Sequence, residues 1–83
     1  MGEKKYTDTD MRLYRAVGKQ VSLRRAELEY SRAALEALVG MRSGSLAHIE
    51  AGDTACPLHV LVQLAEVFDC TLDDLVPVLT ESK

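Results

Sequence analysis

Apolar residues recur at intervals of three and four along most of this chain, which is the spacing of amphipathic helices. The first helix is expected to be capped by Thr7 or Thr9 and to end near Ala26. The apolar stripe of this helix is formed by Met11, Tyr14, Val17, Val21 and Leu28. No segment shows convincing strand patterning, so the expected fold class is all-α.

Two short helices follow, joined by a tight turn. Ser31 is a good cap for a helix over residues 32–39, and Gly40 ends it because the position after a helix often needs a left-handed backbone. The next helix is expected over residues 42–51, stopped by Gly52. This spacing is the one that a helix-turn-helix needs, and its second helix is the one presented to a DNA groove.

Two further helices are expected in the C-terminal part. One covers residues 57–68, with Pro57 in its first turn, where the missing N–H of proline costs nothing. The other begins after Thr71, and Asp74 completes an acidic variant of the capping box. The apolar faces are Leu61, Leu64, Ala65 and Phe68 of the first, pointing inward, and Leu72, Leu75, Val76 and Leu79 of the second, pointing inward or toward a partner.

The 83 residues, of which 47% are hydrophobic, predict one compact domain. Residues 7–79 are expected to form the helix-turn-helix domain, with a disordered N-terminus over 1–6 and a frayed C-terminus over 80–83. The chain lacks the apolar centre of a secretory signal and any run near the ~20 residues of a membrane span, so the cytoplasm is expected. In that compartment Cys56 and Cys70 are expected as two buried or half-buried thiols.

Charge is distributed unevenly along the chain, although the net value is only −3. Residues 1–42 carry nine Lys and Arg against six Asp and Glu, whereas residues 43–83 carry one against seven. A basic face of this kind can bind phosphates, while the acidic remainder keeps the protein in solution and limits non-specific binding.

Several residues at matching spacing carry a family resemblance: Ser31, Leu35, Gly40, Ile49-Glu50-Ala51-Gly52, Leu64-Ala65 and the segment Thr71–Leu75. Over about residues 17–76 the chain resembles the Cro/repressor-type (Xre) helix-turn-helix proteins, which have a lambda-repressor-like domain. The resemblance implies five helices, with the helix-turn-helix formed by the second and third. It also implies an ion pair between Arg25 and Glu50 that fixes the first helix against the reading helix.

The same resemblance, read with the chemistry of the side chains, gives the expected DNA-contacting set: Arg32, Arg42, Ser43, Gly44, Ser45 and His48. Arg32 is placed for a phosphate, and Arg42 for guanine O6 and N7 or for a phosphate. His48 should face outward and donate to a base or phosphate. Gly44 offers no base contact but allows close backbone approach to the groove.

Three positions depart from the family pattern. Glu36 stands where Ala is usual, so it is expected to reach solvent or to pair with Arg32. Gly44 removes a base-reading side chain, which shifts readout toward DNA shape. Asp53 begins a loop where relatives often carry a cation for phosphates, and backbone N–H groups at helix starts are expected to replace part of that loss.

These observations predict a sequence-specific regulator, a repressor or an autoregulating controller, that binds double-stranded DNA in the major groove. A homodimer through the C-terminal helices would read two half-sites about 34 Å apart. Its surface is expected among Val60, Val62, Val67, Val76, Val78 and Leu79. The alternative is a helix-turn-helix scaffold that binds a protein partner, antitoxin-like or polymerase-binding, with weak or no DNA binding.

Other classes of function find no support in the pattern of residues. No arrangement of Ser, His and acidic residues predicts an enzyme, and no glycine-rich loop predicts a cofactor. His48, His59, Cys56 and Cys70 lack the spacing of a metal site. The expected setting is bacterial or phage cytoplasm, in association with the nucleoid.

Overall fold

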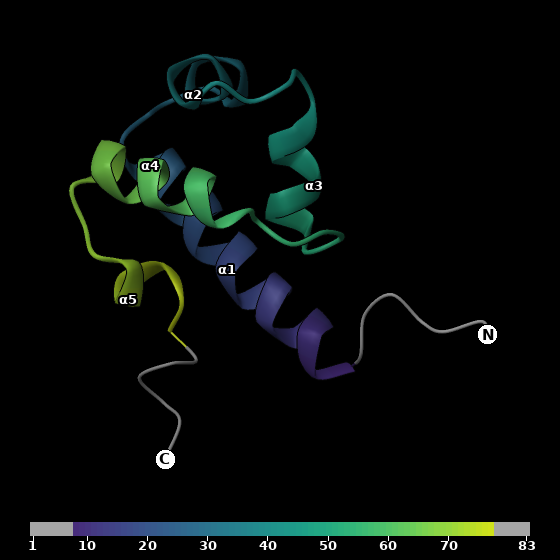
Figure 1. The fold of residues 1–83 in the computed structure, drawn as a ribbon. Helices are drawn as coiled ribbons and strands as arrows, with labels where there is room; N and C mark the ends of the chain where they lie inside the picture. Colours follow the sequence, from purple (N-terminus) through teal and green to yellow (C-terminus); the bar gives the residue numbers. More distant parts are fainter. Residues whose placement is uncertain (1–7, 78–83) are drawn as a thin grey trace.

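The computed structural model describes residues 8–77, which fold into five helices in the predicted order (Figure 1). The helices are α1 (Asp8–Glu27), α2 (Arg32–Val39), α3 (Ser45–Ala51), α4 (Leu58–Phe68) and α5 (Leu72–Leu75). No strand occurs between residues 8 and 77, and the all-α fold class is confirmed. The ends expected over 1–6 and 80–83, together with Thr7, Val78 and Leu79, lie outside the described residues.

The long helix α1 packs against α3, α4 and α5, whereas α2 packs against α3 and α4. Asp8 and Asp10 occupy the first turn of α1 and Arg24 and Arg25 its last, so the charges at both ends interact favourably with the helix dipole. The chain leaves α1 through Glu29, which has a positive φ of 62°. The following Tyr30 N–H donates to the Arg25 carbonyl at 3.1 Å, as in a Schellman ending.

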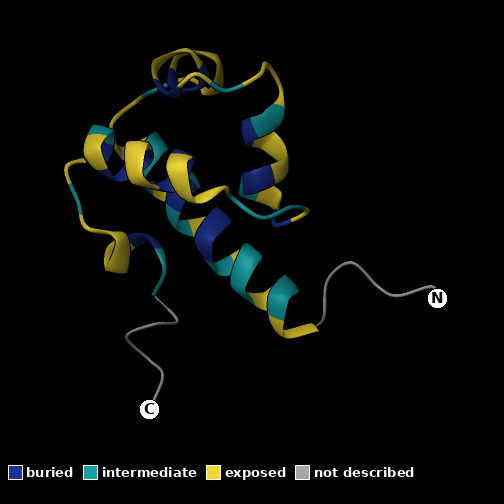
Figure 2. Ribbon diagram, viewed as in Figure 1, coloured by how far each residue is buried: buried dark blue, intermediate teal, exposed yellow. Residues whose placement is uncertain are grey.

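Each of the five helices contributes one fully buried side chain to a single core. Its largest fully buried members are Val21, Leu35, Leu46, Leu64 and Leu75. The predicted inner face of α4 is confirmed, because Leu61, Leu64, Ala65 and Phe68 are all buried. Figure 2 shows the buried positions on the helix faces turned toward one another.

Two apolar predictions need correction. Val60, expected as surplus surface, is 5% exposed and belongs to the core, because it lies on the buried side of α4. Leu28, expected in the apolar stripe of the first helix, is 49% exposed, because α1 ends at Glu27 and Leu28 lies in the turn that follows. Leu72, expected to point inward or toward a partner, is 37% exposed. Periodicity places a residue on a face only approximately, and packing against other helices decides which edge of that face is covered.

Glycine lets α1 approach α3 at backbone distance. A Cβ on Gly18 would clash with the Ile49 carbonyl oxygen and lie 2.7 Å from that of Glu50. Gly52 ends α3 at a φ of 81°, and a Cβ there would lie 2.8 Å from the Cα of Arg15. These two contacts press the C-terminal end of α3 against α1 and fix its direction.

The start of α5 is as predicted, and the start of α4 is one residue later. The Thr71 hydroxyl accepts from the Asp74 N–H at 3.2 Å, and the Asp74 carboxylate accepts from the Thr71 N–H at 3.1 Å, which confirms the capping box. Pro57 precedes α4 as its N-cap instead of lying in its first turn. Cys56 and Cys70 are free and half-buried, as expected.

Candidate nucleic-acid interface

The first half of the helix-turn-helix forms through local caps. The Ser31 hydroxyl accepts from the Ala34 N–H at 3.0 Å, which starts α2. Gly40 ends it with a φ of 71°, and its N–H donates to the carbonyl of Glu36. The N–H of Met41 donates to the same carbonyl at 2.8 Å, so the chain turns sharply away from α2.

The second helix is shorter than predicted, because α3 starts at Ser45 and not at Arg42. Gly44 adopts a φ of 90°, which is incompatible with a right-handed helix, so helical geometry starts only after it. Residues 42–44 instead form a turn closed by the Ser45 N–H, which donates to the Arg42 carbonyl at 3.1 Å. The expected contact residues Arg42, Ser43 and Gly44 therefore lie in a turn that precedes the helix, and all three are exposed.

Glu36 provides the cap that Gly44 lacks. Its side chain is buried, and its Oε2 accepts from the Gly44 N–H at 3.0 Å and from the Leu46 N–H at 2.9 Å. The expectation that Glu36 reaches solvent or pairs with Arg32 is therefore wrong, because the two backbone donors attract the carboxylate inward. These N–H groups at the start of α3 are consequently not free to bind a phosphate.

A second buried carboxylate joins α1, α2 and α3. Glu50 has a side chain only 3% exposed, and its Oε2 lies 2.6 Å from Arg25 Nε. The other oxygen, Oε1, accepts from Arg25 at 3.2 Å and from Arg32 Nε at 3.0 Å. The hydrogen bond to Glu50 raises the pKa of Arg25, although burial opposes this. The pair between Arg25 and Glu50 implied by the resemblance is thus present, with Arg32 as a further member.

Arg32 retains an accessible side chain despite this contact. Its side chain is 52% exposed, compared with 17% for Arg25. Arg25 is therefore the inner partner of Glu50, and Arg32, the first residue of α2, is its outer partner at the surface. An exposed guanidinium at that position remains able to meet a phosphate.

The outward face of α3 is made of small residues and one imidazole. Ala47, His48 and Ala51 are exposed, whereas Leu46 and Ile49 are buried. His48 Nδ1 lies 3.6 Å from Asp53 Oδ2, with both side chains about two-thirds exposed, so this contact contributes little to stability. The outward orientation expected for His48 is what the structure shows.

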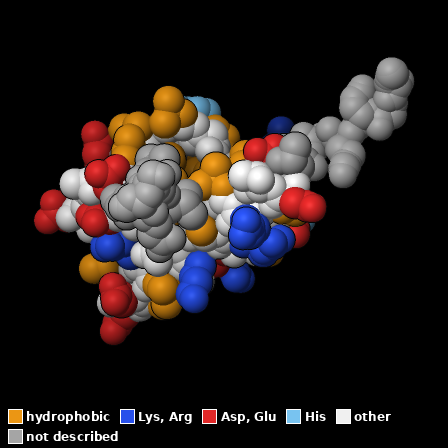
Figure 3. Space-filling model, turned by 90° about the horizontal axis from the view of Figure 1, so that it is seen from below, with side chains coloured by type: hydrophobic (Ala, Val, Ile, Leu, Met, Phe, Trp, Pro, Cys, Tyr) orange, Lys and Arg blue, Asp and Glu red, His pale blue; other side chains and the backbone are white. Residues whose placement is uncertain are grey.

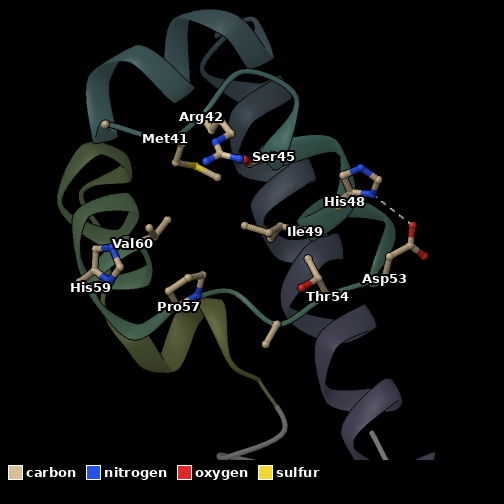
Figure 4. A pocket seen from close by; sticks show the side chains of 12 residues that line it. Met41, Arg42, Ser45, His48, Ile49, Asp53, Thr54, Pro57, His59 and Val60 are labelled. Atoms are coloured by element: carbon tan, nitrogen blue, oxygen red, sulfur yellow. Dashed lines mark ion pairs between the residues drawn. The ribbon is translucent and has the colours of Figure 1, made fainter. Parts of the chain in front are cut away.

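A hollow of about 500 Å³ separates α3 from the beginning of α4 (Figure 4). Arg42, Met41 and Ser45 lie together at one end of it, and His48 and Asp53 lie on its outer rim. Its floor is apolar, formed in part by the buried Ile49 and Val60. Three of the six contact residues predicted from the sequence, Arg42, Ser45 and His48, therefore line this hollow, and Arg32, Ser43 and Gly44 do not.

The structure adds a basic face on α1 that sequence reasoning did not single out. Arg12, Arg15 and Lys19 are exposed and follow one another at intervals of three and four residues, so they share one side of the helix. Arg15 lies against Gly52, which places this side next to the end of α3. Figure 3 shows several Lys and Arg side chains close together in the middle and on the right of the view, and most of the acidic ones on the left. The intervals of three and four between Arg12, Arg15 and Lys19 would have been enough to predict this basic face from the sequence.

The described residues form neither a metal site nor a reactive thiol. Within residues 8–77, no three His, Cys, Asp or Glu side chains gather closely enough to hold a metal ion. Burial raises the pKa of Cys56 to about 11, which keeps it a thiol at neutral pH. None of the described helices combines the length and apolar character needed to cross a bilayer.

The fold and the exposed turn define the class of this protein: a five-helix domain whose second and third helices form a helix-turn-helix. A family model described as helix-turn-helix matches residues 21–75. The chain belongs to that family of DNA-binding domains, and the Cro/repressor-type resemblance is confirmed. Searches of curated proteins and of solved structures gave no match.

Proposed function

We propose that this protein binds double-stranded DNA in a sequence-specific manner as a small transcriptional regulator, either a repressor or an autoregulating controller. The observation that carries the proposal is the exposed turn over residues 42–44, which projects Arg42 and Ser43 directly before a short helix with His48 on its outer face. Such a regulator acts in the cytoplasm on the nucleoid.

In this proposal α3 and its preceding turn enter the major groove, which is about 12 Å wide and admits a helix. Arg42 reads guanine O6 and N7 through its two parallel donors, or holds a phosphate. The hydroxyls of Ser43 and Ser45 and the ring of His48 supply further hydrogen bonds, and Gly44 lets the backbone approach the bases. Arg32 meets a phosphate at the edge of the groove.

The dimer that this mode of binding calls for is proposed to form through α4. Leu58 and Val62 lie one turn apart on this helix and are 69% and 40% exposed. Sedimentation velocity tests the assignment. Val62→Glu should shift the protein to monomer, whereas Gln63→Glu, which adds the same charge to the neighbouring exposed position, should not. An unchanged dimer in both variants would exclude this surface.

The DNA-binding proposal is tested by fluorescence anisotropy with duplexes selected by the protein from a random-sequence pool. Affinity should fall steeply with salt, because phosphate contacts release counterions. Arg42→Ala should abolish the preference for the selected sequence. Gln63→Glu again serves as the control, because it lowers the net charge by one without altering the proposed interface.

The alternative, a scaffold for a protein partner, draws support from the small side chains of Ala47 and Ala51 on the outer face of α3 and from the engagement of Arg32 by Glu50. Both reduce the number of groups available to read bases. If no sequence is enriched, and wild type and Arg42→Ala bind DNA equally poorly at low salt, the DNA-binding proposal is overturned in favour of this alternative.

A further inference from the structure

We propose that Glu36 is a positioning residue for base recognition: its buried carboxylate fixes where α3 begins and thereby the orientation of the turn that carries Arg42 and Ser43. The inference rests on the proposed DNA-binding function. Glu36 itself cannot touch DNA through its side chain, because only 5% of the residue is exposed. Any effect on recognition must pass through the groups it holds.

The carboxylate acts as an N-cap supplied by another helix. A helix start leaves several backbone N–H groups without partners, and a capping side chain normally accepts one of them. Gly44 occupies the N-cap position of α3 and makes no side-chain cap. Glu36 Oε2 replaces it by accepting from Gly44 and Leu46, and it places a negative charge at the positive end of the helix.

Glu36 also holds the other end of the same turn. Its backbone carbonyl accepts from the N–H groups of Gly40 and Met41, while its side chain accepts from Gly44 and Leu46. One residue therefore brackets the segment in which Arg42 and Ser43 lie. This matters because residues 42–44 have no regular helix of their own to orient them.

The arrangement has a consequence for recognition. Since the carboxylate occupies the start of α3, a DNA phosphate cannot take the same N–H groups there. Binding at this end of the helix then draws on the side chains of the turn, whose direction Glu36 sets. Loss of the carboxylate should therefore reduce discrimination between sequences more than it reduces the attraction to phosphates.

Three substitutions test this. Glu36→Gln keeps an oxygen in place of Oε2 and can accept from both N–H groups. Glu36→Met has similar volume and no acceptor. Glu36→Asp keeps the charge but withdraws the acceptor by one methylene. Thr71→Ala is the matched control, because it removes an equivalent cap from α5, far from the turn.

The first readout is the ratio of affinities for the selected duplex and for a scrambled one, together with the salt dependence of each. Glu36→Met should lower this ratio about tenfold, since an unsatisfied buried donor carries a penalty of that order. The salt dependence should stay unchanged, because the phosphate contacts remain. Glu36→Gln and Thr71→Ala should keep the wild-type ratio.

The second readout is amide hydrogen exchange, which does not need DNA. Exchange at Gly44 and Leu46 should accelerate in Glu36→Met and remain slow in Glu36→Gln. If the Met variant is unfolded by circular dichroism, the Asp variant decides, with an expected loss in the ratio of about threefold.

Unchanged discrimination in the folded Met variant, or in the Asp variant in its place, overturns the inference while leaving DNA binding intact. Absence of any selected sequence for wild type overturns the proposed function and this inference with it, whereas the exchange rates still report whether Glu36 caps α3.

Discussion

Replacing Glu50 by Ala should destabilise the fold far more than removing an exposed acid. The Glu50 side chain is 3% exposed and that of its partner Arg25 17%, so the substitution leaves a largely buried guanidinium without its counter-charge and with the Tyr30 carbonyl as its remaining acceptor. Breaking a buried pair in this way costs about 3–5 kcal/mol. A domain of this length is stable by only about 4–12 kcal/mol, so the expected loss is a large share of the total.

Urea unfolding followed by circular dichroism at 222 nm measures this loss directly. Asp53→Ala is the matched control, because Asp53 pairs with His48 at 3.6 Å with both side chains about two-thirds exposed, and its loss should change stability by less than about 0.5 kcal/mol. Arg32→Ala should also cost less than about 1 kcal/mol, since Arg25 continues to neutralise Glu50.

The expected cost comes from the stranded charge of Arg25 and not from the loss of the ion pair itself. The double variant Arg25→Met with Glu50→Leu removes both charges, so it should be considerably more stable than Glu50→Ala. If Glu50→Ala loses less than about 1 kcal/mol, or if the double variant is no more stable than the single one, the argument from burial is refuted.

Three further predictions concern packing and protonation. Gly18→Ala should lower the unfolding free energy by about 2 kcal/mol, because its Cβ meets the carbonyls of α3; an unchanged urea midpoint would contradict that close approach. Hydrogen bonding by Thr71 lowers the pKa of Asp74, so wild type should lose stability as pH falls below about 4, and Asp74→Asn should show a smaller decline; equal declines would exclude this cause. Burial raises the pKa of Cys56 from 9.0 to about 11, so the neutral thiol favours the fold and its contribution should disappear between these pH values. Cys56→Ala should then flatten the alkaline loss measured by thermal melting, and an identical profile would refute the assignment.

Local patterns predicted the parts of the fold that are fixed locally. The limits of α2 agree with the structure because Ser31 and Gly40 act on neighbouring backbone groups. The capping box between Thr71 and Asp74 agrees for the same reason. Each of these features depends on residues three or four positions apart, which a sequence pattern contains directly.

The start of α3 could not be predicted in this way. Apolar spacing and propensity extend a helix back to Arg42, whereas the positive φ of Gly44 and the distant carboxylate of Glu36 delay it to Ser45. Glu36 lies 10 residues before Leu46, the donor it accepts, so no local rule connects them. The inner position of Val60 likewise depends on how α4 packs in the core and not on its own sequence.

Helix α3 is stabilised mainly from outside itself. A helix of seven residues is too short to persist alone, so its geometry depends on tertiary contacts. One buried glutamate fixes each end: Glu36 accepts from the first N–H groups, and Glu50 ties the last turn to α1 through Arg25. Because the exposed face carries few side chains able to read bases, small changes in helix direction should alter recognition strongly. Substitutions that shift sequence preference are therefore expected at buried positions of α1 and α2 as well as on the surface of α3.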